Sequence, residues 1–333
     1  MVKFRSRSND ESALKLGKAG TKRKKPGIIQ DILYNKFSYL IALPVMLYVF
    51  IFSYCAYPYM IIAFQRYNYQ NHTIMDILTK GKWVGLDNFK FFFQSLTAFR
   101  VTYNTLYLNI LFIIFGTVTS VLLAILLNEL RSRWFVKTTQ SIMLFPNYIS
   151  WIVVSYLLLG LFSNEYGIVN RVMADMGKTS INWYITSEVW PAILVIVRTL
   201  KGAGMRAIIY LAAIASIDPN LYEAAVIDGA SRLQRISKVT LPLITPTIVI
   251  LTLLAIGNIM YGDFGMIFAI VGDNGTLYET TDIIDTYVFR ALRRVGDPSQ
   301  AMAISLFQSV IGFIMVFGSN WFTRRIYPDG ALY

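Results

Sequence analysis

The side chains that most often carry enzyme chemistry are scarce in this chain of 333 residues. It contains one cysteine, Cys55, and one histidine, His72, which excludes an internal disulfide and any zinc or haem site built from these residue types. The sequence contains neither the phosphate-binding GxxxxGK[ST] motif nor the GxSxG motif of a nucleophile elbow. We therefore expect a protein without catalytic residues, a metal site or a cofactor of its own.

Turn-forming, small and charged residues gather instead in one segment, residues 217–246. Asp218 is a good N-cap and Pro219 suits the first helical position, so a short helix is predicted from Pro219 to about Asp228. Gly229 then permits a positive φ and a sharp turn. The segment therefore predicts a helix that ends in a bend.

After the bend, residues 231–239 are predicted to form a second short helix, with basic side chains at Arg232, Arg235 and Lys238. Leu241 and Pro242 are expected to begin the next apolar segment. Two short helices joined by a bend are consistent with a docking element for another protein. An amphipathic connector that rests on lipid headgroups fits the same residues equally well. The residues alone leave both interpretations open.

The elements around this segment are those of a membrane protein. Hydrophobic residues make up 55% of the chain and charged residues 15%, with a mean hydropathy of +0.50, whereas roughly a quarter of an average soluble domain is charged. Buried helices of a large soluble protein are the alternative, but they would show amphipathic stripes that these long apolar runs lack. We expect an all-α polytopic membrane protein.

Six apolar segments approach or exceed the roughly 20 residues that a helix needs to cross a bilayer. These segments are Phe37–Phe64, Val101–Asn128, Thr138–Asn164, Trp190–Leu211, Val239–Gly262 and Pro298–Thr323. The fourth is the weakest, because Arg198, Lys201 and Arg206 interrupt it. The sequence thus predicts six transmembrane helices.

The distribution of basic residues predicts the orientation and the boundaries. Residues 1–36 contain ten lysines and arginines, whereas the equally long loop of residues 65–100 contains five, which places the N-terminus, and after six spans also the C-terminus, in the cytoplasm. We read the run Lys22–Lys25 as part of a solvated topogenic tail rather than a nucleic-acid site. The expected organisation is a basic tail (1–36), one membrane domain (37–323) and a short cytoplasmic tail (324–333).

The segment 217–242 resembles the EAA loop of permease subunits from binding-protein-dependent ABC importers. That pattern is EAA, three residues, G, nine residues and I-x-L-P, and only Val239 departs from it, in place of Ile. The matching residues are Glu223, Ala224, Ala225, Asp228, Gly229, Ala230, Leu241 and Pro242. Further similarity at residues 128–130, 140–154, 167–170 and 208–214 resembles the carbohydrate branch, in particular polysaccharide-type, LplB-like permeases.

This resemblance implies a type I ABC importer permease fold and a set of partners. They are a second homologous permease subunit, two cytoplasmic ATPase subunits that bind ATP and magnesium, and an extracellular solute-binding protein. The resemblance also implies a location in the bacterial plasma membrane, where lipid surrounds the spans. Nucleic acid is not expected as a partner. In the family the EAA helix lies in a groove of the ATPase, so Glu223 and Asp228 are expected to pair with basic groups there, Ala224 and Ala225 to allow close packing, and Gly229 to set the bend.

The resemblance further implies a carbohydrate pathway through the membrane. Sugar sites use aromatic platforms together with amide and carboxylate hydrogen bonds. Candidates inside the predicted spans are Asn147, Tyr148, Trp151, Asn258, Tyr261 and Asp263, and Arg198 is an intramembrane cation able to pair with an anionic substrate or to reach the cytoplasmic surface. Interfacial aromatic residues and helix-packing asparagines are the alternative for the group.

The fifth span makes the pathway hypothesis specific. Asn258 and Tyr261 are three residues apart and would share one helical face, toward the sugar, with Trp151 as a stacking platform. Asp263 would lie off that face, at an outer gate or the binding-protein interface.

Two other functions remain less well supported by the residues. A secondary transporter or channel would need no ATPase, but usually displays intramembrane carboxylate relays or inverted repeats, and only Asp263 is offered here. A membrane-embedded transferase lacks catalytic residues. The EAA pattern favours the importer over both.

Overall fold

The computed structural model describes residues 34–68, 70, 73–130 and 132–326. The basic tail through residue 33, including Lys22–Lys25, lies outside the described residues, as do His72 and residues 327–333 of the C-terminal tail. The chain divides into two units, residues 1–58 and 59–333, and each is described by itself.

The first unit contains the beginning of the first predicted span. Helix α2 (Lys36–Phe52) is apolar after Ser38 and contains Pro44. The 3₁₀ segment η1 (Tyr54–Phe64) continues the run past the division between the units. Together they form an apolar helical stretch, Lys36–Phe64, long enough to cross a bilayer.

The second unit contains the remaining elements. In chain order they are β1 (Gln65–Arg66), α3 (Ile74–Lys80), β2 (Lys82–Trp83), α4 (Asp87–Gln94), α5 (Leu96–Asn128), α6 (Arg133–Tyr148), α7 (Trp151–Phe162), α8 (Ile168–Asp175), η2 (Ser187–Val189), α9 (Trp190–Ala215), α10 (Pro219–Ile227), α11 (Arg232–Arg235), η3 (Ile236–Thr240), α12 (Leu241–Gly257), α13 (Phe264–Ile270), η4 (Gly275–Leu277), α14 (Tyr278–Thr281), α15 (Ile284–Arg290), η5 (Ala291–Val295) and α16 (Pro298–Ile326). The two short strands pair antiparallel, with Gln65 opposite Trp83. The predicted all-α class is therefore confirmed apart from this small ladder.

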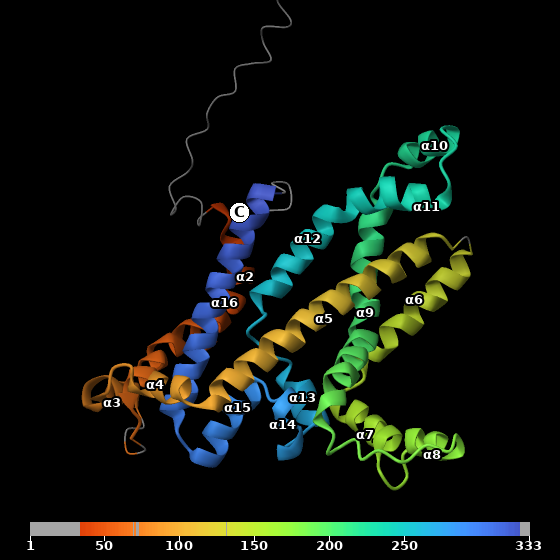
Figure 1. Ribbon diagram of the computed structural model, residues 1–333. Helices are drawn as coiled ribbons and strands as arrows, with labels where there is room; N and C mark the ends of the chain where they lie inside the picture. The colour runs from red at the N-terminus through yellow and green to blue at the C-terminus, as the bar shows by residue number, and fades with distance from the viewer. Residues whose placement is uncertain (1–33, 69, 71–72, 131, 327–333) are drawn as a thin grey trace, which may run out of the picture. The chain divides into compact units, whose positions relative to one another are not determined.

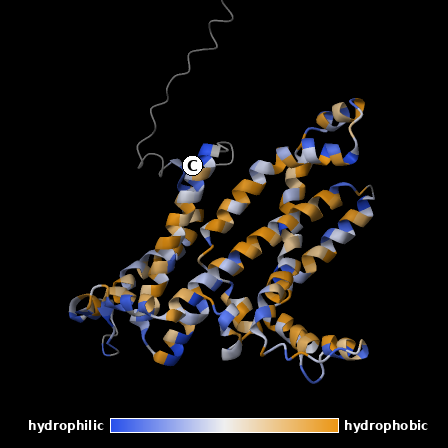
Figure 2. Cartoon of the chain, viewed as in Figure 1, coloured by the Kyte–Doolittle hydropathy of each residue, from blue (hydrophilic) through white to orange (hydrophobic). Residues whose placement is uncertain are grey.

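Among the described residues, four helical stretches are long and apolar enough to cross a membrane, and a bent pair adds a fifth. The four are Lys36–Phe64, Leu96–Asn128, Arg232–Gly257 and Pro298–Arg325, and the pair is α6 with α7. Helix α9 is long enough at 26 residues but contains the three basic residues that weaken the fourth prediction. In Figure 2, hydrophobic residues, coloured orange, predominate along the long helices.

The third predicted span is not one straight helix. Helices α6 and α7 meet at an angle of 92° across a short break. Pro146 lacks an N–H and weakens the last turn of α6, and the Ser150 hydroxyl accepts a hydrogen bond from the Val153 N–H at 3.3 Å, which starts α7 as an N-cap. The expectation of a continuous helix over Thr138–Asn164 was therefore wrong.

The fifth predicted span begins earlier than expected. The second short helix is not separate from it, because α11, the π turn η3 and α12 form one helical stretch, Arg232–Gly257. Pro242 cannot donate to the carbonyl four residues before it, and the Leu241 N–H bonds to the Ile236 carbonyl instead, which makes the π turn. The predicted boundary at Pro242 is therefore a bulge inside a helix.

The same helix also ends earlier than expected, at Gly257 rather than Gly262. Asn258 is the C-cap residue, and the next residues turn before α13 begins. The Asp263 carboxylate starts α13 by accepting a hydrogen bond from the Met266 N–H at 3.0 Å. Glycine and N-capping residues at these positions favour a break over a continuous helix.

Helices α5 and α9 pack together at the centre of the second unit (Figure 1). One cluster around Trp190, Leu194 and Leu108 joins them to α7 and α13, and a second around Tyr210 and Ala207 joins them to α12. Helix α10 lies at one end of this unit, and α7, α8, α13 and α14 lie at the opposite end (Figure 1). The packing leaves a cavity at the level where α6 and α12 are interrupted.

Candidate functional site

A cavity of about 440 Å³ lies between α5, α6, α7, α9 and the turn after α12. Six of the seven predicted pathway residues line it: Asn147, Trp151, Arg198, Asn258, Tyr261 and Asp263. Tyr148 is not among the lining residues and is 75% exposed. The other lining residues are Asn109, Phe112, Ile113, Lys201, Gly202, Met205, Arg206 and Ala255.

Arg198 is held at the cavity wall by two residues of α5 and by the N-cap residue of α13. One terminal nitrogen donates to the Asn109 amide oxygen at 3.3 Å, and the guanidinium lies over the Phe112 ring at 4.2 Å. Its Nε is 4.0 Å from the Asp263 carboxylate, at the outer limit of an ion pair. The guanidinium therefore faces the cavity and leaves donors available to a ligand.

Lys201 lies one turn along α9 from Arg198 and spans the break between α6 and α7. Its ammonium donates to the Asn147 carbonyl at 2.7 Å and lies 5.0 Å from the centre of the Trp151 ring. Asn147 thus contributes its backbone to this contact. The lysine links α9 to the broken segment and places a positive charge beside the aromatic ring.

Arg206 completes the basic side of the cavity. A β-carbon at Gly116 in α5 would overlap its guanidinium, so the glycine provides the space that the arginine occupies. Arg198, Lys201 and Arg206 come from one side of α9, and Asp263 is the acidic residue that lines the cavity with them. The formal charge of the lining is therefore +2.

The turn after α12 places its polar residues differently from the prediction. Asn258 and Tyr261 do not share a helical face, because the helix has already ended. The Asn109 amide donates to the carbonyls of Ile259, at 2.9 Å, and Tyr261, at 3.2 Å. A buried asparagine of α5 thus satisfies the open backbone of the turn, which lipid could not do.

The side chains of the turn are anchored individually. The Tyr261 hydroxyl is 2.8 Å from the Ser309 hydroxyl of α16, and the Asn258 amide donates to the Leu254 carbonyl at 3.1 Å. The Gly262 N–H donates to the Asp285 carboxylate at 2.6 Å. Burial raises the pKa of Asp285, and the hydrogen bond from Gly262 opposes the rise. These hydrogen bonds therefore fix the turn as part of the cavity wall.

Sequence reasoning missed Asn109, Lys201 and Arg206 as lining residues. The spacing of Arg198, Lys201 and Arg206 could have indicated that Lys201 and Arg206 lie beside Arg198, since residues three and eight positions apart lie on one side of a helix. Asn109 offers no such signal, because its partners are carbonyls about 150 positions away.

The coupling candidates form a second surface at the opposite end of α9. The Asp218 carboxylate caps α10 by accepting from the Asn220 N–H at 3.0 Å. Gly229 has a φ of +76°, and the Ala230 N–H donates back to the Ala225 carbonyl at 2.9 Å, which closes the turn. The predicted helix and glycine bend are confirmed.

Several members of the EAA pattern are solvent-exposed on α10. Glu223, Ala224 and Asp228 are exposed, and neither carboxylate has an ion pair within the described part of the chain. Ile227 is 86% exposed. The carboxylates of Glu223 and Asp228 and the Ile227 side chain are therefore accessible at the surface of α10.

Leu241 and Pro242, at the end of the EAA pattern, lie on α12 and are not part of the exposed surface of α10. Leu241 packs within the apolar cluster around Ile244 and Tyr210, and Pro242 follows the π turn. The Tyr222 hydroxyl is 3.0 Å from the Thr240 hydroxyl, which ties α10 to the helix that continues to the cavity. The structure therefore divides the pattern into an exposed part and a packed part.

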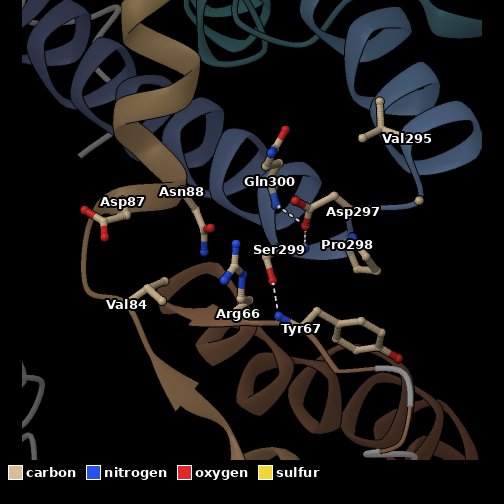
Figure 3. A pocket seen from close by; sticks show the side chains of 11 residues that line it. Arg66, Tyr67, Val84, Asp87, Asn88, Val295, Asp297, Pro298, Ser299 and Gln300 are labelled. Atoms are coloured by element: carbon tan, nitrogen blue, oxygen red, sulfur yellow. Dashed lines mark hydrogen bonds between the residues drawn. The ribbon is translucent and has the colours of Figure 1, made fainter.

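A further cavity of about 500 Å³ lies away from the predicted pathway, where the segment after η1 meets the start of α16 (Figure 3). The Tyr67 N–H donates to the Ser299 hydroxyl at 2.9 Å, and the Asp297 carboxylate accepts from the N–H groups of Ser299 and Gln300. Asp297 therefore caps the start of α16, and the contact between Tyr67 and Ser299 joins the segment after η1 to this helix.

Comparison with known proteins gives a consistent result over most of the chain. Residues 116–328 match the family described as binding-protein-dependent transport system inner membrane component. The chain is 32% identical to protein LplB of Bacillus subtilis, covering 89% of this chain and 91% of that protein. It is 33% identical to the polygalacturonan/rhamnogalacturonan transport system permease protein YteP of the same organism, covering 93% and 94%.

A solved structure is similar in fold as well as in sequence. A chain of a bacterial alginate ABC transporter, crystallised in complex with an alginate pentasaccharide-bound periplasmic protein, has a TM-score of 0.79 and 32% identity, covering 90% of this chain and 98% of that chain. With the family match over residues 116–328, these similarities confirm the fold that the EAA pattern predicts. The chain belongs to the inner membrane components of binding-protein-dependent transport systems.

Proposed function

We propose that this chain is the permease subunit of an ATP-driven importer for an anionic oligosaccharide, which crosses the membrane through the cavity beside α9. The single observation that carries the choice of substrate is the cavity lining, in which Arg198, Lys201 and Arg206 face Asp263 beside the Trp151 ring. A neutral sugar needs no excess of cations. A uronic acid unit offers both a carboxylate and an apolar ring face.

The relatives support this substrate class. The names of YteP and of the solved transporter refer to polygalacturonan or rhamnogalacturonan and to alginate. An intramembrane arginine is costly unless a partner or ligand compensates it, and the Arg198–Asp263 distance of 4.0 Å compensates it only weakly. A carboxylate of the substrate would complete the environment of Arg198.

We also propose the assembly and orientation that the family implies. The partners are a second permease, two ATPase subunits that bind ATP and magnesium, and an extracellular solute-binding protein, with this chain needing no cofactor. The count is six spans, taking α6 with α7 as one and α9 as another, with both termini in the cytoplasm of a bacterial cell. Helix α10 contacts an ATPase subunit through Glu223, Ala224, Ala225 and Asp228, and its movement reaches the cavity along the continuous stretch Arg232–Gly257.

The test measures stimulation of ATP hydrolysis by binding protein loaded with a uronic acid oligosaccharide. Glutamine at Arg198, or alanine at Asn258 or Tyr261, is expected to lower this stimulation about tenfold or more, since a hydrogen bond to a charged group contributes about 1.5–3 kcal/mol. Alanine at Trp151 is expected to lower it because the aromatic contact with the sugar ring is lost. Lys90→Gln changes an exposed residue outside the cavity and is the control. Normal stimulation in all four variants would place the pathway elsewhere, and failure of the variants to assemble would make these residues helix-packing groups.

A further inference from the structure

A smaller cavity, of about 350 Å³, lies at the end of the second unit opposite α10. Its lining combines two aromatic rings with arginines: Phe268, Asp273, Phe289, Arg290, Arg293 and Arg294. The cavity is formed where α13 packs against α15 and the π turn η5. None of its lining residues lines the cavity beside α9.

The three arginines differ in how far their charge is compensated. Arg290 donates to the buried Asp282 carboxylate at 2.6 Å and lies over the Tyr278 ring, so its role is structural. Arg294 pairs with Asp273 at 2.9 Å, and both side chains are exposed. Arg293 has no acidic partner within the described part of the chain, and its guanidinium lies 5.7 Å from the Phe289 ring.

An aromatic cluster extends from this cavity toward the one beside α9. Phe264 and Phe268 are stacked one turn apart on α13, with ring centres 5.2 Å apart. Phe289 of α15 contacts both rings, at 5.1 and 4.9 Å. Phe264 directly follows Asp263, which lines the cavity beside α9. Three half-buried rings therefore extend from the lining of the smaller cavity to the residue next to Asp263 in the chain.

We infer that the cavity around Arg293 is a second saccharide-binding site, which holds one uronic acid unit of an oligosaccharide at the mouth of the pathway. Arg293, together with Arg294, binds the carboxylate, and the Phe268 and Phe289 rings contact the apolar face of the sugar. The cluster of Phe264, Phe268 and Phe289 guides the chain toward Asp263 and Arg198. This inference rests on the proposed anionic substrate but concerns residues that the pathway hypothesis does not include.

The test is direct binding of a fluorescently end-labelled uronic acid pentasaccharide to the complete importer in nanodiscs, without the binding protein. The double variant Arg293→Gln/Arg294→Gln is expected to weaken binding about three- to tenfold, as for exposed charge-assisted contacts screened by salt. Lys82→Gln removes an exposed cation outside this cavity and is expected to bind as the wild type does. The methyl-esterified, neutral pentasaccharide is expected to bind wild type weakly and to show no effect of the double variant.

The other outcomes separate this inference from the proposed function. If Arg198→Gln weakens uronate binding and the double variant does not, the second site is wrong and the proposed substrate stands. If wild type binds neutral and acidic pentasaccharides equally, the proposed anionic substrate fails, and the second site fails with it. If the double variant binds the saccharide normally but no longer responds to ligand-free binding protein, the arginines form a protein-docking surface and the inference is overturned, as it is if wild type shows no saturable uronate binding.

Discussion

Single residues at two distant places set the properties on which the transport hypothesis depends. Gly229 adopts a φ of +76° at the end of α10, and Gly116 leaves space for the Arg206 guanidinium beside the cavity. The first glycine is required by backbone conformation, because a β-carbon there would have no neighbour within 4 Å. The second is required by the space around a side chain. The two positions therefore permit separate tests of coupling and of the pathway.

Gly229→Val is expected to abolish uptake, because a β-branched residue with positive φ is strained by about 1–2 kcal/mol or more and α10 would be misaligned. Gly229→Asn should retain part of the uptake, since asparagine tolerates this conformation. Gly177→Val is the matched control, because Gly177 has a φ of +74°, also has no neighbour within 4 Å of an added β-carbon, and follows α8 at the other end of the unit. Substrate uptake into cells and co-purification of the ATPase subunits are measured.

Uptake that survives Gly229→Val, with the ATPase subunits still bound, would favour a connector resting on lipid. Equal loss in the Gly177 control would attribute the effect to general strain.

Gly116→Ala is expected to displace the Arg206 guanidinium from the basic side of the cavity, because the added methyl group overlaps it. We expect a severalfold rise in the concentration of substrate-loaded binding protein needed for half-maximal ATP hydrolysis. Gly160→Ala, where nothing lies within 4 Å of the new methyl group, is the control. An unchanged response in Gly116→Ala would show that Arg206 does not contribute to the pathway.

At the scale of elements, the cavity lies where two helical segments beside α9 are interrupted, because residues next to both interruptions line it. The break between α6 and α7 exposes the Asn147 carbonyl, which Lys201 binds, and the turn after α12 exposes carbonyls that Asn109 binds. Each interruption thus has a polar partner on an adjacent helix. Close packing of α9 against α6 keeps the first pair in contact.

Gly204→Ala is expected to lower stability, because a β-carbon there would overlap the backbone carbonyl of Met143 where α9 crosses α6. Forcing extra atoms into such a contact costs about 1–3 kcal/mol. Gly318→Ala on α16 has open space around the new methyl group and should be neutral or slightly stabilising. The measurement is the thermal midpoint of the purified importer in detergent, and equal midpoints for the two variants would contradict the packing argument.

At the scale of the whole molecule, α10, which we propose as the coupling surface, and the arginine-rich cavity lie at opposite ends of the second unit. The cavity beside α9 lies at the far end of the stretch that begins next to α10 and ends at Gly257, where Ala255 lines it. A displacement of α10 would be carried along that stretch as a rigid helix, with η3 as the point of local adjustment. This mechanism requires that α10 and the loop containing Lys82 face opposite sides of the membrane.

Cysteine labelling tests this orientation in a Cys55→Ser background. Lys82→Cys is expected to react with an impermeant thiol reagent in intact cells, because residues 65–100 are predicted to be external. Asn220→Cys, exposed on α10, is expected to react only after the membrane is permeabilised. The reverse pattern would invert the topology and remove the basis for an ATPase contact at α10.

The sequence by itself determined the membrane class, the family and the local structure of α10. Apolar runs of bilayer length have few soluble alternatives, and Asp218, Pro219 and Gly229 act through backbone preferences that operate within a few residues. The tertiary structure alone decided which polar residues meet. Local residues favour the break at Ser150 and the end of α12 at Gly257, but the carbonyls opened there bind partners that are distant in sequence. Lys201 binds the Asn147 carbonyl, and Asn109 binds the Ile259 carbonyl, 150 positions away. The sequence placed Asn258 and Tyr261 together because they would share a helical face, but the helix ends before them. They line one cavity with Arg198 and Lys201 because of the way α5, α9 and α12 pack.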